Sequence, residues 1–500
     1  MIIAAAQFTP VPGDIEANAA RMATLLTEAA ERGAGLVLFS ELALTHYDRH
    51  LIAADPAGLT VTEDDARLAP LREACRATGV AAVVNAAGRT GGDGDRPAIS
   101  SFVLGPDGTL LTRYDKIHLF EGEGEGEGAS EGESESALFA PGTADGRFTL
   151  GGIRFALATC FDNSFPEVPA RAAADGCRVY LASSFHDSAQ RVAQYGQLAR
   201  EHGLHVLLAN GTGTGHSGPG CGLSGVWLPS GERVAAAAEW TGPVPGDGAE
   251  LVLSDVRDLI TLMADPAVAA IPVQECGEPL VDVRTAAPEL LVADLRDDER
   301  GAYAQLREGV LKRLLAAQRA LPDGLRLKVV EGYRPLELQR RYFEGYVDEL
   351  RALHPDRDAG RLHQAASRYV SPPGIAPHSA GGAVDLTLVT TAGEDVDMGT
   401  PINASPEESN GACYTGAPDL SPAARTHRRV LNAALHSAGL VNYPTEWWHW
   451  SYGDRYWALT TGADHALYGP KEWDGPTEGD GPTEGDGPKE GDGPTEGDGR

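Results

Sequence analysis

The stretch "APHSAGGAVDLTL", residues 376–388, determines how the second half of the chain must fold. Its two adjacent glycines, Gly381 and Gly382, permit a tight bend before the strand pattern "AVDLTL". The bend lets the imidazole of His378 converge with the carboxylate of Asp385. A histidine and a carboxylate that converge in this way are suited to bind a divalent metal ion.

A second segment, "PTEWWHW" at 444–450, offers a further imidazole and a further carboxylate. With His449 as a third ligand, Zn²⁺ would keep a fourth, open position, as a catalytic site requires. Glu446, three residues earlier, is close enough to shuttle the proton of a bound water without ligating the metal. The tryptophans would exclude solvent. Taken singly, each histidine is better explained as a turn residue or a packed core residue, because ligand spacing over distant residues is weak support for a metal site.

Residues 266–470 resemble the zinc D-Ala-D-Ala dipeptidases, the peptidase family that includes the vancomycin-resistance dipeptidase. The matching pieces stand in order as "GEPLVDVR", "EGYRP", "HSAGGAVDLTL", "DMGTP" and "EWWH". The resemblance implies an α+β zinc peptidase domain that holds one Zn²⁺. It implies three zinc ligands, namely His378, Asp385 and His449. It also implies Glu446 as general base and Arg334 as the cation that stabilises the tetrahedral oxyanion.

Two positions depart from that family's pattern. Ala376 stands where such enzymes often carry serine. Asn403 stands where they often carry an aspartate that helps to hold the free ammonium of the substrate. Loss of a carboxylate opposite a buried ammonium could cost about 2–5 kcal/mol. We therefore expect Asn403 to be a substrate-binding position, and a dipeptide other than D-Ala-D-Ala stays open as the substrate.

The first half of the chain alternates strand and helix signals and predicts an α/β layered domain that closes near 250–256. Asp14 is expected to cap a helix that ends at Gly33. The apolar face of this helix is predicted to consist of Ile15, Ala19, Met22, Leu25, Leu26 and Ala29. Further helices are predicted over 167–175 and 188–203, and hairpin turns at 105–108 and 229–232.

The second half is expected to mix helices and strands. Helices are predicted near 297–320, over 421–438 and in the polar region 336–369. Strands are predicted at "LRLKVVEGYRP" and "GGAVDLTLV".

Three reactive residues of the first half follow strand patterns: Glu41, Lys116 and Cys160. In α/β sheets, ligand-binding and active sites lie at the edge where the carboxyl ends of the strands meet. A thiol nucleophile needs a base to accept its proton and a cation to favour the thiolate, which Glu41 and Lys116 could supply. Taken singly, Cys160 is better explained as a small apolar core residue, and the two charged residues as surface residues.

Residues 1–257 resemble the carbon–nitrogen hydrolase (nitrilase) superfamily through "AAAQFTPVPGD", "FSELAL", "YDKIHLF", "ESALFAPG" and "CFDNSFPE". The resemblance implies an α-β-β-α sandwich, with Glu41 as base, Lys116 as cation and Cys160 as nucleophile. Glu135 matches a second glutamate of the site. Ser164 stands where the superfamily usually has arginine, which puts full activity in doubt. An amidase is expected, because most members cleave carboxamides.

Nearly half of the net charge of −31 lies in two stretches that carry −7 each, and the rest of the chain is moderately acidic. Seven glutamates lie at 121–135, within a segment (121–136) that is expected to be an inserted acidic loop. Residues 471–500 carry a GPTEGD-type repeat with no apolar core, which predicts a disordered acidic tail. The acidity makes nucleic acid and anionic membranes poor partners.

Six scattered cysteines without a CxxC pattern argue against a disulfide framework and favour a reducing, cytoplasmic setting. No window approaches 18 uninterrupted apolar residues, so no membrane span is expected.

Together these features predict a bifunctional hydrolase of small amides and dipeptides. Its parts are an amidase-type domain (1–257), a zinc dipeptidase domain (266–470) and the tail. Successive steps on cell-wall peptides are conceivable. Two alternatives stay open. The first domain could be a non-catalytic scaffold that serves oligomerisation or small-ligand binding, or the zinc domain could be a D,D-carboxypeptidase that acts on longer peptides.

Overall fold

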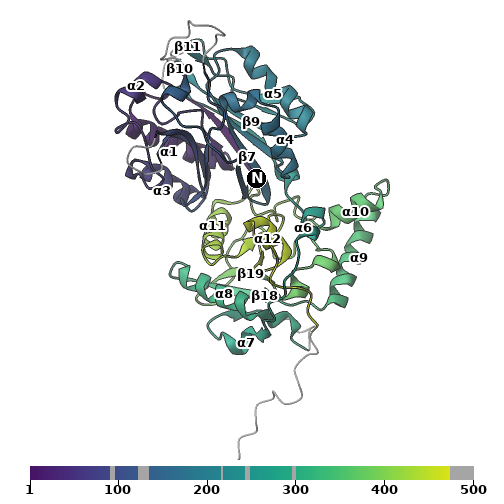
Figure 1. Cartoon of the computed structure of the whole chain (residues 1–500). Coiled ribbons are helices and arrows are strands. Elements are labelled where there is room, and N and C mark those ends of the chain that lie inside the picture. Colours follow the sequence, from purple (N-terminus) through teal and green to yellow (C-terminus); the bar gives the residue numbers. More distant parts are fainter. Residues whose placement is uncertain (90–95, 122–133, 216–217, 243–247, 295–299, 473–500) are drawn as a thin grey trace, which may run out of the picture.

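The structure is a computed structural model that describes residues 1–89, 96–121, 134–215, 218–242, 248–294 and 300–472. Most of the expected acidic loop and nearly all of the expected tail lie outside these ranges. Figure 1 shows two lobes, which correspond to the two halves of the sequence, with the N-terminus at their junction. None of the described helices has an apolar run that could span a bilayer.

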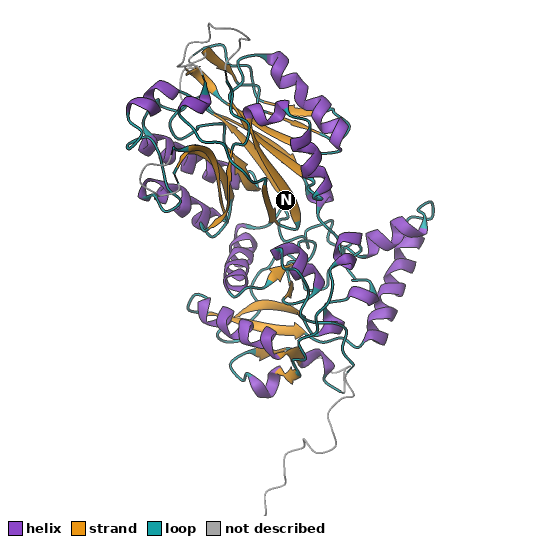
Figure 2. Cartoon of the chain, in the orientation of Figure 1, coloured by secondary structure: helices purple, strands orange, loops and turns teal. Residues whose placement is uncertain are grey.

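The first half contains two six-stranded sheets (Figure 2). The first has the order β14-β1-β2-β3-β4-β5 and is formed by β1 (Ile2–Gln7), β2 (Ala34–Leu38), β3 (Ala81–Gly88), β4 (Ala98–Leu104), β5 (Leu110–Asp115) and β14 (Glu250–Asp255). The second has the order β13-β12-β9-β8-β7-β6 and is formed by β6 (Gly146–Leu150), β7 (Ile153–Thr159), β8 (Val179–Ser184), β9 (His205–Asn210), β12 (Gly225–Trp227) and β13 (Arg233–Ala236). A separate hairpin pairs β10 (Thr212–Gly215) with β11 (Gly218–Cys221).

Helices cover the outer face of each sheet. They are α1 (Ile15–Glu31) and α3 (Ala69–Thr78) on the first sheet, and α4 (Glu167–Ala174) and α5 (Ala189–His202) on the second. A short helix, α2 (Arg49–Ala54), precedes α3. Apolar residues of both sheets, among them Leu36 and Leu181, form one core between them. Because both faces of each sheet are covered, the inner strands are continuously apolar. This confirms the predicted α-β-β-α sandwich.

The local predictions for this half are confirmed. Asp14 caps α1 by accepting a hydrogen bond from the backbone of Ala17 at 2.9 Å. The residues predicted for the apolar face of α1 are all buried. Both predicted hairpin turns join antiparallel strands, β4 to β5 and β12 to β13. All six cysteines are free thiols.

The second half is built on a five-stranded sheet with the order β16-β18-β19-β21-β20. Its strands are β16 (Leu291–Val292), β18 (Leu325–Glu331), β19 (Ala383–Thr390), β21 (His449–Ser451) and β20 (Val441–Asn442). A two-stranded sheet pairs β15 (Leu280–Asp282) with β17 (Gln305–Arg307). The helices are α6 (Pro266–Ala270), α7 (Val283–Ala286), α8 (Glu308–Ala320), α9 (Leu336–Leu353), α10 (Ala359–Ala366), α11 (Pro422–Ser437) and α12 (Arg455–Thr461). The side chains of α8 and α11 share a core with the sheet and with the buried Trp447, Trp448 and Trp450.

The helix predicted near 297–320 is wrong at its start. Its described part begins only at Glu308, and Gln305–Arg307 form strand β17. Leu306 is fully buried, and its neighbour Arg307 donates to the carbonyl of Ala380 at 2.8 Å. These tertiary contacts override the helical periodicity of the segment.

The two halves touch through the segment that joins them and through α11. Thr261 donates its backbone N–H to the carbonyl of Gly152, at the turn between β6 and β7, at 2.8 Å. On α11, Arg429 donates to the carbonyl of Ala77, in α3, at 2.9 Å. The halves therefore pack against each other directly.

Candidate active sites

The first site lies where β19 and β21 pair in the second half. His378 is in a short 3-10 turn (His378–Ala380) just before β19. Asp385, on β19, lies directly opposite His449, on β21, in the antiparallel register. Side chains of directly opposed residues point to the same face of a sheet, so this register brings the carboxylate and the imidazole together.

The three side chains form a compact ligand set. His449 Nδ1 is 3.0 Å from Asp385 Oδ1 and 3.2 Å from His378 Nε2, and His378 Nε2 is 3.4 Å from Asp385 Oδ2. Ligands about 2.1 Å from a tetrahedral Zn²⁺ lie about 3.4 Å from one another. The donor set therefore fits a zinc ion in spacing and in chemistry. Among the described residues it is the only such group of three or more histidine, cysteine and acidic side chains.

The orientation of His378 is fixed by its second ring nitrogen. Nδ1 lies 2.6 Å from the carbonyl oxygen of Gly332, which can only accept a hydrogen bond. Nδ1 therefore carries the proton, and the lone pair of Nε2 faces Asp385 and His449.

Glu446 and Arg334 flank this ligand set. Glu446 is almost completely buried, with its carboxylate 3.8 Å from His449 Nδ1. Burial and the nearby charge of Asp385 raise the pKa of Glu446 well above its usual value. Arg334 follows β18, where the Glu331 carboxylate accepts two hydrogen bonds from its guanidinium at 2.7 and 2.6 Å. The arrangement offers a proton acceptor, Glu446, and a fixed cation, Arg334, beside the ligand set.

The loop that carries Asn403 forms a neighbouring rim. Asn403 is exposed and lines a hollow of about 540 Å³ together with Thr400 and Glu408. Its backbone carbonyl accepts a hydrogen bond from the Tyr369 hydroxyl at 2.7 Å. Trp447 Nε1 donates to Thr400 Oγ1 at 2.8 Å, so the tryptophan segment is hydrogen-bonded to this loop.

The segment 466–472, here called the strap, was missed by sequence reasoning. Its Lys471 donates its backbone N–H to the carbonyl of Ser379, next to His378, at 3.0 Å. The carbonyl of Lys471 accepts from the Tyr333 hydroxyl at 2.7 Å. The strap therefore holds both the turn of His378 and the residue before Arg334. These are mainly backbone contacts, for which the sequence carries no signal.

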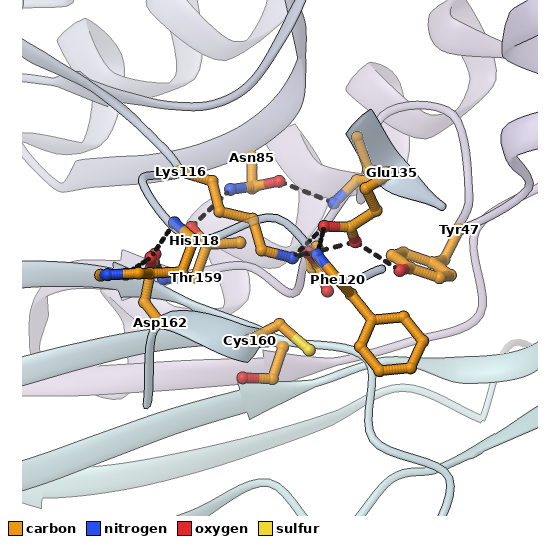
Figure 3. A network of polar contacts seen from close by, with 12 residues as sticks. Tyr47, Asn85, Lys116, His118, Phe120, Glu135, Thr159, Cys160 and Asp162 are labelled. Atoms are coloured by element: carbon orange, nitrogen blue, oxygen red, sulfur yellow. Dashed lines mark hydrogen bonds and ion pairs between the residues drawn. The ribbon is translucent and has the colours of Figure 1, made fainter. Parts of the chain in front are cut away.

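The second site lies at one end of the strands of the first half (Figure 3). The ammonium group of Lys116 lies 2.8 Å from a carboxylate oxygen of Glu41 and 2.8 Å from one of Glu135. All three side chains are buried. Glu135 also accepts hydrogen bonds from the Tyr47 hydroxyl at 2.6 Å and from the backbone of Phe120 at 2.8 Å. The residues predicted from strand ends do come together.

Burial and nearby charges shift the pKa values of Glu41 and Glu135 in opposite directions. Burial and the proximity of Cys160 raise the pKa of Glu41 well above its usual value. Burial also acts on Glu135, but Lys116 and the hydrogen bond from Tyr47 lower its pKa below the usual value. Burial disfavours the charge on Lys116, yet the two carboxylates hold its pKa well above normal. The group therefore has one carboxylate that stays ionised and one that can take up a proton.

Cys160 begins a 3-10 turn (Cys160–Ser164) directly after β7, on the side of Lys116 and Glu135 (Figure 3). Its φ of +45° lies in the left-handed region that residues other than glycine rarely adopt. Asp162 holds this turn by accepting hydrogen bonds from the backbones of Thr159 at 2.9 Å and His118 at 2.8 Å. The sequence "TCFD" at 159–162 has the capping-box spacing and could have revealed Asp162. Ser164 is exposed.

Comparison with family models matches each half to a different family. Residues 2–254 match the model described as carbon-nitrogen hydrolase. Residues 300–465 match the model described as D-ala-D-ala dipeptidase.

Individual relatives carry names from both families. A D-alanyl-D-alanine dipeptidase of Synechocystis sp. is 32% identical over 226 residues, which cover 39% of this chain and 90% of that protein. A nitrilase of Pyrococcus abyssi is 31% identical over 173 residues, which cover 33% of this chain and 57% of that protein. The chain thus spans little more than half the length of the nitrilase. A crystal structure of an amidase from Nesterenkonia sp. is 27% identical, with 52% of this chain and 90% of that chain covered and a TM-score of 0.43.

The matches divide the chain where its two architectures divide. The chain belongs to the carbon-nitrogen hydrolase family through its first half and to the D-Ala-D-Ala dipeptidase family through its second half.

Proposed function

We propose that the chain is a bifunctional hydrolase: a thiol-dependent amidase over residues 1–257, joined to a zinc-dependent dipeptidase over residues 266–470. D-Ala-D-Ala or a related dipeptide is the proposed substrate of the second domain. Small carboxamides are the proposed substrates of the first.

The dipeptidase proposal depends above all on the three side chains of His378, Asp385 and His449, whose nearest donor atoms lie 3.0–3.4 Å apart in each pair. His378, Asp385 and His449 would hold one Zn²⁺, which supplies Lewis-acid polarisation of the peptide carbonyl and of the attacking water. Glu446 accepts a proton from that water and delivers it to the leaving amine. The guanidinium of Arg334 opposes the negative charge that develops on the carbonyl oxygen.

Metal removal tests this proposal. A chelator should abolish D-Ala-D-Ala hydrolysis, and added Zn²⁺ should restore it. Glu446→Gln should retain the metal but lose at least about 100-fold in kcat. Dipeptide hydrolysis that survives complete metal removal contradicts the proposal.

Substrate length separates the dipeptidase from the alternative D,D-carboxypeptidase. A dipeptidase releases D-Ala from D-Ala-D-Ala and leaves a pentapeptide that ends in D-Ala-D-Ala intact. Faster cleavage of the pentapeptide would favour the carboxypeptidase. Asn403 raises the further question of whether the substrate has a free ammonium group, because a neutral amide attracts an ammonium less than a carboxylate does. A panel of free and N-acylated dipeptides addresses it.

The amidase proposal depends on Lys116 and its two carboxylates, which are buried beside Cys160. The thiolate of Cys160 attacks the amide carbon after its proton passes to Glu41, and Lys116 opposes the charge on the carbonyl oxygen. The C–N bond then breaks, Glu41 returns the proton to the leaving amine, and a thioester remains. Water, deprotonated by Glu41, cleaves the thioester to the free acid and regenerates the thiol.

A panel of small amides and a thiol-directed probe test this half. Cys160→Ala should abolish release of ammonia or amine and leave dipeptide hydrolysis intact. Parallel loss of both activities would contradict the division into two sites. The alternative, a non-catalytic scaffold, predicts an unreactive Cys160. Against the scaffold stands the cost of burying three ionisable groups, which a scaffold does not require.

A further inference from the structure

The nucleophile turn of the first half needs external support. Cys160 has a positive φ of 45°, a conformation that is unfavourable for a side chain with a Cβ atom. Such a conformation persists only where the surrounding contacts hold the neighbouring peptide groups in place. The contacts of the Cys160 carbonyl group therefore indicate which residues hold this conformation.

The side-chain amide of Asn163 provides one such contact. Its Nδ2 donates to the carbonyl oxygen of Cys160 at 2.9 Å. The same nitrogen donates to the hydroxyl oxygen of Tyr195, in α5, at 3.0 Å. The amide thus ties the strained peptide group to a helix on the outer face of the second sheet.

Tyr195 is the centre of a buried polar network. Its hydroxyl lies 2.9 Å from Ser184 Oγ and 3.0 Å from His186 Nε2. Tyr195 is 2% exposed, and Ser184 and His186 are buried as well. Burial lowers the pKa of His186 to about 4, so the imidazole is neutral at neutral pH. The network therefore fixes positions without placing a further charge beside Cys160.

The network also reaches the other sheet. The carbonyl of Ser184, at the end of β8, accepts the backbone N–H of Glu41 at 3.4 Å. Ser183 reinforces this junction, since its hydroxyl donates to the carbonyl of Phe39 at 2.8 Å. A chain of hydrogen bonds therefore runs from the carbonyl of Cys160, through Asn163, Tyr195 and Ser184, to the backbone of Glu41.

We propose that Asn163 and Tyr195 are positioning residues that set the nucleophile turn of Cys160 relative to the turn of Glu41. The inference rests on the proposed amidase function and adds the part of the chain that aligns nucleophile and base. Neither residue touches the substrate in this proposal.

Three variants test it: Tyr195→Phe, Asn163→Leu and the double variant. Tyr195→Phe keeps the ring and removes only the hydroxyl. The matched control is Tyr180→Phe, because the Tyr180 hydroxyl is buried in the same core cluster and bonds to none of the described residues. For each protein we would measure kcat and KM on a small amide, the rate of Cys160 alkylation by peptide mass spectrometry, and the melting temperature.

Each single variant should lower kcat about 10- to 100-fold, because a small misplacement of reacting groups is costly, while KM stays within about threefold. Alkylation of Cys160 should slow, and Tyr180→Phe should match the parent. Because the two residues act in one chain of bonds, the double variant should lose little more than the worse single variant.

Two results would overturn the inference: kinetics and alkylation within twofold of the parent, or losses in the single variants that multiply in the double variant. The outcome is separable from the fate of the amidase proposal. If the parent hydrolyses no amide and the variants still slow Cys160 alkylation, the proposed function fails and the positioning role stands. If the parent hydrolyses amides and the variants equal it in kinetics and in Cys160 alkylation, the amidase function stands and the positioning role fails.

Discussion

Two glutamates that share one lysine are driven to opposite protonation behaviour. Glu41 and Glu135 both contact Lys116 in a buried space. Tyr47 and the backbone of Phe120 donate to Glu135, which keeps it ionised. The second carboxylate oxygen of Glu41 has no hydrogen-bond partner among the described residues, which leaves it free to take a proton. The local environment thus favours Glu41 over Glu135 for the proposed role of base.

The pH profile of amide hydrolysis should reflect Glu41. Burial raises its pKa, and the base must be deprotonated to act, so kcat/KM should fall on acidification at a pH well above the usual carboxyl value of about 4.3. Glu41→Gln should lose at least about 100-fold in kcat/KM across the profile. Initial rates measured from acidic to mildly alkaline pH check this. A parent profile that stays flat down to the ordinary carboxyl range contradicts the assignment.

A buried histidine should make the first half sensitive to acid. His205 is 3% exposed, lies 3.0 Å from Ser254 Oγ, and has a pKa lowered to about 4 by burial. Between this value and about 6.5 the unfolded chain binds a proton that the folded chain does not, so stability falls as the pH falls through this window. The loss should reach about 2 kcal/mol at pH 5. The melting temperature should therefore drop less between pH 7 and pH 5 in His205→Asn than in the parent. Equal drops would count against this reading.

At the scale of elements, short segments without regular structure complete the metal site. The strap crosses from the core to the turn that carries His378. Arg307, on β17, donates to the carbonyl of Gly469 at 3.2 Å, and Glu275 accepts the backbone N–H of Gly469 at 2.7 Å. The family model ends at residue 465, before every residue of the strap. The strap is thus a support that lies beyond the part of the chain that the family model matches.

A proline at residue 471 should weaken the metal site. Lys471→Pro removes the N–H that donates to Ser379, whereas Lys471→Ala keeps it. Loss of an outer support of a ligand typically lowers metal affinity about 10- to 100-fold, so Lys471→Pro should release Zn²⁺ more readily to a competing chelator. Lys471→Ala serves as the control and should bind metal like the parent. If the two variants bind metal equally well, the strap does not position His378.

The elements that the sequence predicts correctly are those with a local signal. Helix α1 has its cap and its apolar period within one stretch, and the two hairpins have their turn residues. The predicted start of α8 was wrong because β17 forms only by pairing with β15, which lies in a distant part of the sequence. The proposed metal ligands could be predicted from motif residues, but the register of Asp385 with His449 could not. Tyr195 was missed for the same reason, since it reaches Cys160 only across the fold.

At the scale of the whole molecule, the two candidate sites are far apart. β7 lies between Gly152, at the junction of the halves, and Cys160, and its seven residues span about 23 Å. The proposed nucleophile Cys160 therefore lies at the end of the strand remote from the second half. The two sites should turn over independently, and a product of one must diffuse through solvent to reach the other.

One tyrosine links the joining segment to the candidate metal site, and its hydroxyl should stabilise the second half. The Tyr443 hydroxyl accepts the backbone N–H of Met263 at 3.0 Å and donates to the carbonyl of Ser367, while its ring packs against His449. Tyr443→Phe leaves both buried backbone groups without this partner, which costs about 1–3 kcal/mol, or about 2–4 °C in melting temperature per kcal/mol. The joining segment should also be cut faster by a protease.

Tyr456→Phe is the matched control, because the Tyr456 ring packs against Tyr443 and its buried hydroxyl bonds to none of the described residues. The control should melt like the parent or slightly higher, since a buried unpaired hydroxyl is unfavourable. Equal melting temperatures and equal cleavage rates for the two variants would show that the Tyr443 hydroxyl does not fasten the segment.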